Sequence, residues 1–293
     1  RRYRLFDNFV STIDLMDIYG TYYCLDGVIH AAGSQTGEAE GEISFYEVIR
    51  TRNGIPVFFD DHMKRLTAGI ATRYSLSEDI PAAVRKGIGT LVNAERFPEI
   101  NVRVTVSFTG QEHSISIYYI KSSYPAVEMY RRGVDLVLYR AERIDPGVKL
   151  LNHRMRLAVN ELIEKKKAYE ALLVNNQGFI TEGSRSNVFF IDNDDTVYTA
   201  PDPMILQGIT RKYVIEICRK EGIRLIYEAV RAIDIARFSA VFITGTSPMV
   251  LSARRIDNVA FSAEKNIVEE LRIKYEKLMN ESIWEYERHN KAD

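Results

Sequence analysis

The stretch ALLVNNQGFITEGSRSNVFFIDNDDTVYT, residues 171–199, decides the class of fold. It consists of short strand-like runs separated by turn-forming residues such as Asn176-Gln177-Gly178 and Asp192–Asp195. Runs of this length between such turns are typical of β-hairpins. The predicted strands are residues 171–175, 178–182, 187–191 and 196–199.

Hairpin signals also precede this stretch. Asp26-Gly27 and Asn53-Gly54 favour tight two-residue turns, and each stands between strand-like runs. Thr109-Gly110 joins two further apolar runs. The additional predicted strands are residues 22–25 with 28–29, 44–51 with 55–59, 101–108 with 113–120, 134–139 and 240–244.

Helical patterns separate the hairpins. The first twenty residues have apolar side chains at roughly helical spacing, and Asp60 or Asp61 is expected to cap the helix that carries residues 62–66. The other predicted helices are residues 80–95, 151–170, 210–221 and 263–288. Strand clusters separated by helices indicate two α+β domains rather than a doubly wound sheet.

Residues 140–148 contain charges and Pro146-Gly147, so we expect them to connect the two domains. The predicted division is an N-terminal α+β domain over 1–140, a linker over 141–148 and a C-terminal domain over 149–293. A chain of 293 residues is long enough for two medium domains.

The composition, with 46% hydrophobic and 27% charged residues, is that of a globular protein. A net charge of −1 predicts no broad attraction to nucleic acid or to an anionic membrane. The chain has only two cysteines, which makes a disulfide framework improbable, and it has no run of 18 apolar residues. We therefore expect a cytoplasmic protein. The five histidines are scattered, so no metal site is predicted.

Common nucleotide and hydrolase motifs are missing: the chain has no GxGxxG after a strand, no P-loop and no GxSxG. Lys149 stands between apolar residues at the predicted interdomain segment, where partial desolvation would favour imine chemistry. Taken alone, a lysine that extends to solvent explains this position more simply. Glu182 ends a predicted strand, where a carboxylate is either an exposed turn residue or the partner of a buried cation.

Two glycine-containing segments are candidate anion sites. Leu206–Arg211 opens a helix, and its free backbone N–H groups with the Thr210 hydroxyl suit an anion. Gly245-Thr246-Ser247 follows a strand and suits a second small anion site. Ordinary caps and turns explain each segment equally well when it is taken alone.

Six collinear segments together resemble the fold-type IV pyridoxal-phosphate enzymes. They are FYEVIR (45–50), DHMKRL (61–66), VKLLN (148–152), ITEGSRSNVF (180–189), GITR (208–211) and TGTS (244–247). That family contains branched-chain aminotransferases, D-amino-acid aminotransferases and 4-amino-4-deoxychorismate lyases. The resemblance implies a smaller N-terminal α/β domain, a larger C-terminal domain with a β-barrel-like sheet flanked by helices, and a homodimer.

The resemblance also implies a role for each matched residue. Lys149 would form a Schiff base with pyridoxal 5'-phosphate and then shuttle a proton as general base and acid. Glu182 would bind the pyridine nitrogen and keep it protonated, and Asn187 would support the Glu182 loop. The cofactor phosphate would be held by Arg65, by the backbone N–H groups of Ile209 and Thr210, and by the hydroxyls of Thr210 and Thr246.

Candidate substrate contacts are less strongly marked. Tyr46 matches a position that lines the substrate pocket in family members, and Thr246 with Ser247 slightly favours a pocket of the L-branched-chain kind. Arg103, on a predicted strand, is the candidate for binding a side-chain carboxylate such as that of glutamate; a solvent-facing arginine is an equal alternative. A packed or solvated position at a helix start explains His153 better than a substrate contact does.

Departures from the family segments separate the possible reactions. The tyrosine that branched-chain enzymes usually carry shortly after the lysine is missing, since Asn152 is followed by His153. Gln111-Glu112-His113 lacks the arginine of the D-amino-acid enzymes, and Val48 stands where the lyase uses a threonine. We therefore predict transamination between a branched-chain-like amino acid and a 2-oxo acid. The lyase and the D-amino-acid aminotransferase stay as alternatives.

Overall fold

The computed structural model describes residues 18–33, 43–75, 79–143, 145–149 and 153–290. Among these, residues 18–122, Lys149 and 281–290 form one compact unit, unit 1, and residues 123–148 and 153–280 form a second, unit 2. The chain thus leaves unit 1 after Ser122 and not after residue 140. The reason is that β7 (Val134–Arg140) pairs with strands of unit 2.

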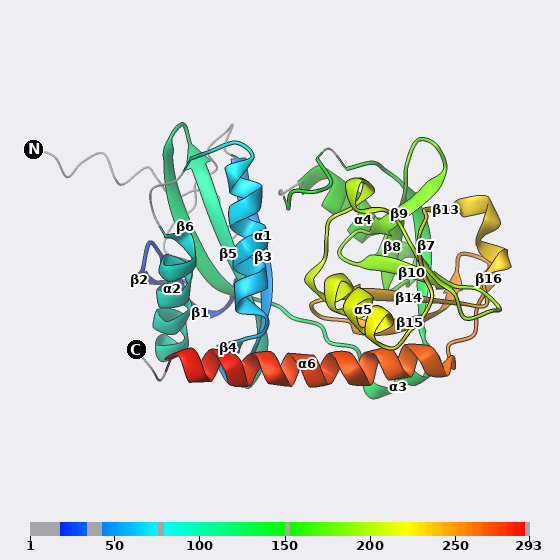
Figure 1. The fold of residues 1–293 in the computed structure, drawn as a ribbon. Helices are drawn as coiled ribbons and strands as arrows, with labels where there is room; N and C mark the ends of the chain where they lie inside the picture. Colours follow the sequence, from blue (N-terminus) through cyan, green and yellow to red (C-terminus); the bar gives the residue numbers. More distant parts are fainter. Residues whose placement is uncertain (1–17, 34–42, 76–78, 144, 150–152, 291–293) are drawn as a thin grey trace, which may run out of the picture. The chain divides into compact units, whose positions relative to one another are not determined.

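Unit 1 contains a six-stranded antiparallel sheet with the order β2-β1-β6-β5-β3-β4. Its strands are β1 (Ile18–Leu25), β2 (Val28–Ala31), β3 (Ile43–Arg52), β4 (Ile55–Pro56), β5 (Glu99–Thr109) and β6 (Glu112–Ile120). Helices α1 (Phe59–Ala71) and α2 (Ile80–Ala94) lie against one face of this sheet (Figure 1). Side chains alternate along each strand, so Glu47 faces the helices while its neighbour Tyr46 faces the other way.

The two predicted dipeptide turns are confirmed. Asp26 and Gly27 have φ values of 48° and 82°, and Asn53 and Gly54 have 50° and 82°. Two consecutive residues with positive φ are what a type I′ hairpin turn requires. At Gly54 a side chain is also excluded by packing, because an added Cβ would lie 2.5 Å from Val92 Cγ1.

Three local predictions in unit 1 were wrong or fall outside the described residues. Residues 18–20 belong to strand β1 and not to a helix, and residues 1–17 lie outside the described part. The strand expected over 55–59 ends at Pro56, because α1 already begins at Phe59. Neither Asp60 nor Asp61 caps α1: the cap residue is Phe58, whose backbone N–H donates to Ser282 Oγ at 3.2 Å.

Unit 2 is built on a larger sheet with the order β12-β11-β10-β14-β15-β7-β8-β9-β13, and β16 pairs with β15. Besides β7, its strands are β8 (Glu170–Val174), β9 (Phe179–Gly183), β10 (Asn187–Ile191), β11 (Val197–Thr199), β12 (Leu225–Tyr227), β13 (Val230–Arg231), β14 (Ala240–Gly245), β15 (Met249–Ile256) and β16 (Val259–Ala260). The helices are α3 (Val127–Arg132), α4 (His153–Lys166), α5 (Ile209–Lys220) and the 3-10 turns η1 (Asp202–Met204) and η2 (Ala232–Arg237). Helix α6 (Asn266–Asn290) belongs to unit 2 as far as Asn280, and its remaining residues belong to unit 1.

The unit 2 sheet must curl strongly. Strands β9 and β10 are far apart in the strand order, yet only three residues join them, and Gly183 N donates to Ser186 O at 2.7 Å. This agrees with the barrel-like sheet that the resemblance implied. All residues of β8 and β10 are buried, as expected for strands covered on both faces.

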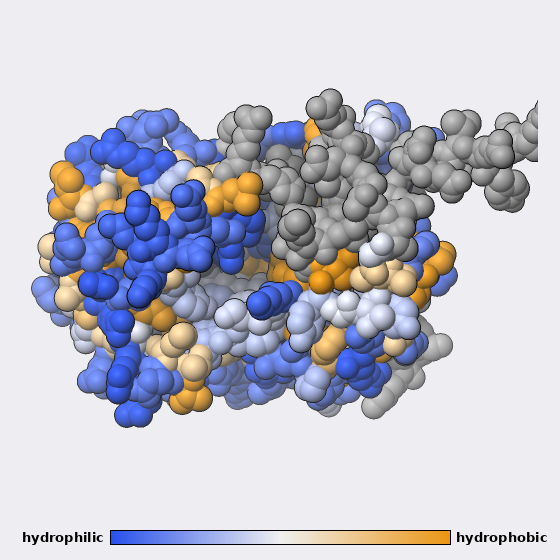
Figure 2. Space-filling view, turned by 180° about the vertical axis from the view of Figure 1, so that it is seen from behind, coloured by the Kyte–Doolittle hydropathy of each residue, from blue (hydrophilic) through white to orange (hydrophobic). Residues whose placement is uncertain are grey.

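The surface carries a mixture of residue types. On the face shown in Figure 2, most residues are hydrophilic and hydrophobic ones are scattered between them, which is ordinary for a protein surface. Among the residues that the structure describes, no helix combines the length and the apolar character needed to cross a membrane.

Candidate active site

Lys149 lies beside strand β3 of the unit 1 sheet. Strand β3 pairs with β5 along its whole length, and its other edge pairs with β4 at Thr51 and Arg52. Further along that edge, Tyr46 N donates to Lys149 O at 3.2 Å. This bond places Lys149 Nζ 3.8 Å from Glu47 Oε2 and 5.0 Å from the centre of the Tyr46 ring.

The Glu47 carboxylate is the centre of a charged cluster. It is fully buried and accepts hydrogen bonds from His62 Nδ1 at 2.8 Å, Arg65 Nε at 2.7 Å and Arg65 Nη2 at 2.6 Å. Burial by itself raises the pKa of Glu47, but the positive charges of Arg65 and Lys149 and the hydrogen bonds from His62 and Arg65 outweigh it and hold that pKa well below its usual range. Burial lowers the pKa of His62, and the charges of Arg65 and Lys149 add to it, so that together they outweigh the Glu47 carboxylate, which raises that pKa; the imidazole is therefore neutral near pH 7.

Arg103 lies on the face of the sheet that carries Tyr46. It is opposite Val48 on β3 and Tyr118 on β6, and its side chain is buried. Its guanidinium carbon is 4.8 Å from the centre of the Tyr46 ring and 6.0 Å from that of Tyr118. The Tyr46 ring is therefore within cation–π distance of both Arg103 and Lys149. These three residues were predicted separately from the sequence.

Glu182 is the penultimate residue of strand β9 in unit 2 and is only 2% exposed. Its Oε2 accepts a hydrogen bond from Leu206 N at 3.2 Å, while Oε1 faces Arg143 Nε at 2.9 Å as an ion pair in poor hydrogen-bond alignment. Burial raises the pKa of Glu182 to about 7, although the charge of Arg143 and the Leu206 N–H oppose it. Arg143 lies in the segment predicted to be a linker, and its importance was missed there.

Asn187 connects Glu182 with the start of helix α5. Its Nδ2 donates to Leu206 O at 2.8 Å, and the N–H of the same Leu206 serves Glu182. An added Cβ at Gly208 would lie 2.1 Å from Asn187 Oδ1, so this close contact requires glycine. Gly208 is the N-cap residue of α5 and makes no side-chain cap bond. The first backbone N–H groups of α5, beginning with Ile209, are therefore not satisfied by a cap.

The predicted threonines lie on different elements of unit 2. Thr210, in the first turn of α5, shares a hydrogen bond of 3.1 Å with the hydroxyl of Tyr275. Thr246 and Ser247 are half-buried in the turn between β14 and β15. Thr244, the register partner of Asn187, has a buried hydroxyl without a hydrogen-bond partner among the described residues.

Glu170 was not predicted, and it organises the turn that follows Glu182. Its buried carboxylate accepts hydrogen bonds from Ser184 Oγ at 2.7 Å, Arg185 N at 3.2 Å and Ser186 Oγ at 3.2 Å. The turn packs closely, because an added Cβ at Gly183 would lie 2.0 Å from Ser186 Oγ. Buried carboxylates with this many donors fix a loop in one conformation.

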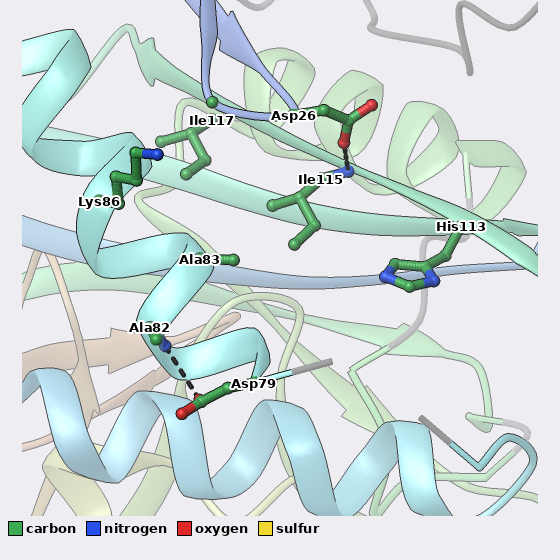
Figure 3. Close-up of a pocket in the computed structure, with 9 residues that line it drawn as sticks. Asp26, Asp79, Ala82, Ala83, Lys86, His113, Ile115 and Ile117 are labelled. Atoms are coloured by element: carbon green, nitrogen blue, oxygen red, sulfur yellow. Dashed lines mark hydrogen bonds between the residues drawn. The ribbon is translucent and has the colours of Figure 1, made fainter. Parts of the chain in front are cut away.

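Unit 1 also has a cavity of about 520 Å³ between α2, β6 and the Asp26-Gly27 turn (Figure 3). Its two carboxylates are engaged by the backbone: Asp26 Oδ1 accepts from Ile115 N at 2.7 Å and Asp79 Oδ1 accepts from Ala82 N at 3.1 Å. None of the predicted site residues line this cavity, so it is separate from the Lys149 cluster.

The chain belongs to the class IV aminotransferase family, since residues 44–256 match the family described as "Amino-transferase class IV". It is 30% identical over 227 residues to the D-alanine aminotransferase of Bacillus licheniformis, covering 72% of this chain and 78% of that protein. It is 26% identical over 248 residues to the probable branched-chain-amino-acid aminotransferase of Rickettsia typhi, with 78% and 83% covered.

Solved structures agree on the fold. The branched-chain aminotransferase from the archaeon Thermoproteus uzoniensis with norvaline is similar with a TM-score of 0.76 and 19% identity, covering 89% of this chain and 95% of that one. Together with the family match, this makes the protein an aminotransferase of the fold-type IV architecture.

Proposed function

We propose that this aminotransferase uses pyridoxal 5'-phosphate and moves an amino group between a branched-chain-like amino acid and a 2-oxo acid. The observation that carries the proposal is the amine of Lys149, held at the β3 edge beside Glu47 and Tyr46. The class IV family depends on this cofactor, which supplies an aldehyde for the amino group and a ring that accepts electrons.

The residues present fit such a cofactor. Glu182 is a buried carboxylate whose Oε1 makes no hydrogen bond within the described residues, so a protonated ring nitrogen would suit it. The uncapped start of α5 would bind the phosphate through the N–H groups of Ile209 and Thr210. Arg65 and the hydroxyls of Thr210 and Thr246 complete the proposed phosphate ligands. Asn187 would support Glu182 through Leu206.

Lys149 is the proposed catalytic base and acid. Its amine would attach the cofactor. Once released, the amine would take the proton from the substrate α-carbon and deliver it to the C4′ carbon of the cofactor. Glu182 would keep a proton on the ring nitrogen during this step. Both roles need groups kept from bulk water, and both side chains are largely buried.

We further propose that Arg103 binds a substrate carboxylate such as that of glutamate. A buried guanidinium one tyrosine ring away from the Lys149 amine favours this over a solvent-facing role. Tyr46, Thr246 and Ser247 would line the rest of the substrate site. We also propose a cytoplasmic homodimer; sedimentation of an active monomer would exclude the dimer.

A second candidate is transamination of D-amino acids, which the similarity to the D-alanine aminotransferase favours. A panel of L- and D-amino acids with 2-oxoglutarate or pyruvate separates the two, because each amino donor changes the visible absorbance of the cofactor. Pyruvate released without any amino acceptor would instead identify the lyase reaction.

The cofactor proposal itself has a direct test. The purified protein with pyridoxal 5'-phosphate is expected to be yellow, and borohydride is expected to fix the cofactor on Lys149, as read by peptide mass. Lys149→Ala should lose the label and turnover together. A colourless protein that takes up no cofactor, or a label on another lysine, would refute the proposal.

A further inference from the structure

We propose that Glu47 is a positioning residue that holds the Lys149 amine by charge while it clamps Arg65 by hydrogen bonds. The inference rests on the proposed role of Lys149 and gives a role to Glu47, a residue of the FYEVIR segment to which the resemblance assigned none. It assigns to one buried carboxylate the placement of two side chains, one proposed to act on the substrate and the other on the cofactor phosphate.

The two oxygens of Glu47 are used differently. Oε1 accepts only one of the hydrogen bonds described above, from Arg65 Nε at 2.7 Å. Oε2 is shared: His62 Nδ1 lies at 2.8 Å, Arg65 Nη2 at 2.6 Å and Lys149 Nζ at 3.8 Å. Arg65 is thus fixed side-on by two short bonds, whereas Lys149 is attracted to the same atom from beyond hydrogen-bond distance.

This difference suits the two side chains. A phosphate ligand works best when its guanidinium is held rigidly, and a double hydrogen bond does that. A lysine that must bond to a cofactor and later exchange a proton has to move, and at 3.8 Å Glu47 Oε2 attracts the amine without a hydrogen bond to it. The Tyr46 N bond to Lys149 O holds the backbone of Lys149 beside this charge.

The charge count of the cluster points the same way. With His62 neutral, one negative charge faces two positive ones, Arg65 and Lys149, in a site where Glu47 is fully buried. Tyr46 and Asp61 are the other ionisable groups that act on Arg65. Removing the carboxylate charge would leave the two cations facing each other, and Lys149 is the one that can release a proton, because an arginine does not.

The test measures how reactive Lys149 is in the full chain freed of cofactor. A short acetylation pulse near pH 7, read by peptide mass, reports the fraction of Lys149 that is unprotonated and accessible, with the exposed Lys86 of the same sample as reference. In Glu47→Gln the acetylation of Lys149 is expected to rise at least about fivefold. This lower limit is the effect of removing one unit charge at this distance when the dielectric constant is that of water.

Glu99→Gln is the matched control. Glu99 also accepts from two arginines of the same sheet, Arg50 and Arg52, but it lies in register with the far end of β3, away from Tyr46 and the backbone of Lys149. Lys149 labelling should therefore stay at the wild-type level. Glu47→Asp keeps the charge and should stay within about twofold of wild type. Equal labelling in wild type and a folded Glu47→Gln would overturn the inference.

A second variant tests the cluster from the other side if Glu47→Gln does not fold. The charge of Lys149 contributes to the low pKa of His62, so Lys149→Met should move the His62 titration midpoint, followed by NMR, to higher pH. An unmoved midpoint would contradict the coupling. Borohydride trapping distinguishes this from the proposed function: a cofactor trapped on Lys149 with unchanged labelling refutes the role of Glu47 alone.

Discussion

Glu182→Gln is expected to remove a pH dependence from the stability of the cofactor-free protein. Burial raises the pKa of Glu182 from 4.5 to about 7 in the folded protein. Between these two values the folded protein keeps a proton that the unfolded chain has already released. Raising the pH through this window therefore destabilises the folded state, and glutamine, which does not titrate, abolishes the effect.

The magnitude follows from the size of the shift. Moving a pKa from 4.5 to about 7 costs about 3 kcal/mol, at about 1.4 kcal/mol per pH unit. No discount for solvent screening is needed, because the Glu182 side chain is only 3% exposed. The wild type should thus lose about 3 kcal/mol of unfolding free energy, relative to the variant, between pH 4.5 and pH 8.

Urea unfolding at the two pH values, followed by circular dichroism, measures this difference directly. The matched control is Glu228→Gln, which changes an exposed carboxylate of the same unit and should leave the difference unchanged. A wild type and a Glu182→Gln variant that differ by the same free energy at both pH values would refute the reasoning. Adding pyridoxal 5'-phosphate should flatten the wild-type dependence, because a cationic ring nitrogen would keep Glu182 ionised.

Three further variants test other contacts. Gly208→Ala should weaken cofactor binding at least tenfold in a spectroscopic titration, because the new Cβ would lie 2.1 Å from Asn187 Oδ1 and displace the start of α5. Arg103→Gln should raise the KM for 2-oxoglutarate by more than tenfold and leave that for pyruvate nearly unchanged, in steady-state kinetics. Glu170→Gln should cost about 1–3 kcal/mol in urea unfolding, because Gln would offer an NH2 group where the turn after Glu182 needs an acceptor.

Local features of the fold were predictable because their cause is local. The positive φ values of the Asp26-Gly27 and Asn53-Gly54 turns are a property of those residue types, so the sequence alone indicated both hairpins. The start of α1 was not predictable in this way. Its cap region is held by Ser282, more than 200 residues away, while Asp60 and Asp61 only resembled caps.

In the candidate site, too, features with a local cause were predictable and features that depend on distant residues were not. Lys149 and Glu182 were predicted from a family pattern, but the charged residues beside them come from distant segments. Arg143 lies in a stretch of charges that resembles a linker, and only the folded chain places it 2.9 Å from Glu182. The sequence does contain a signal for Glu47. It shares one face of a predicted strand with Phe45 and Ile49, and a charge on such an apolar face needs a partner.

Glu47 of unit 1 and Glu182 of unit 2 are both buried carboxylates, and they differ in what surrounds them. Glu47 meets two cations and three short hydrogen bonds, so it stays ionised at any working pH and serves as a fixed counter-charge. Glu182 meets one poorly aligned arginine and one N–H, so burial dominates and its pKa of about 7 leaves it ready to ionise when a cation arrives. Opposite shifts in two similar groups suit the two proposed tasks, in which Glu47 would hold the Lys149 amine and Glu182 would respond to the cofactor.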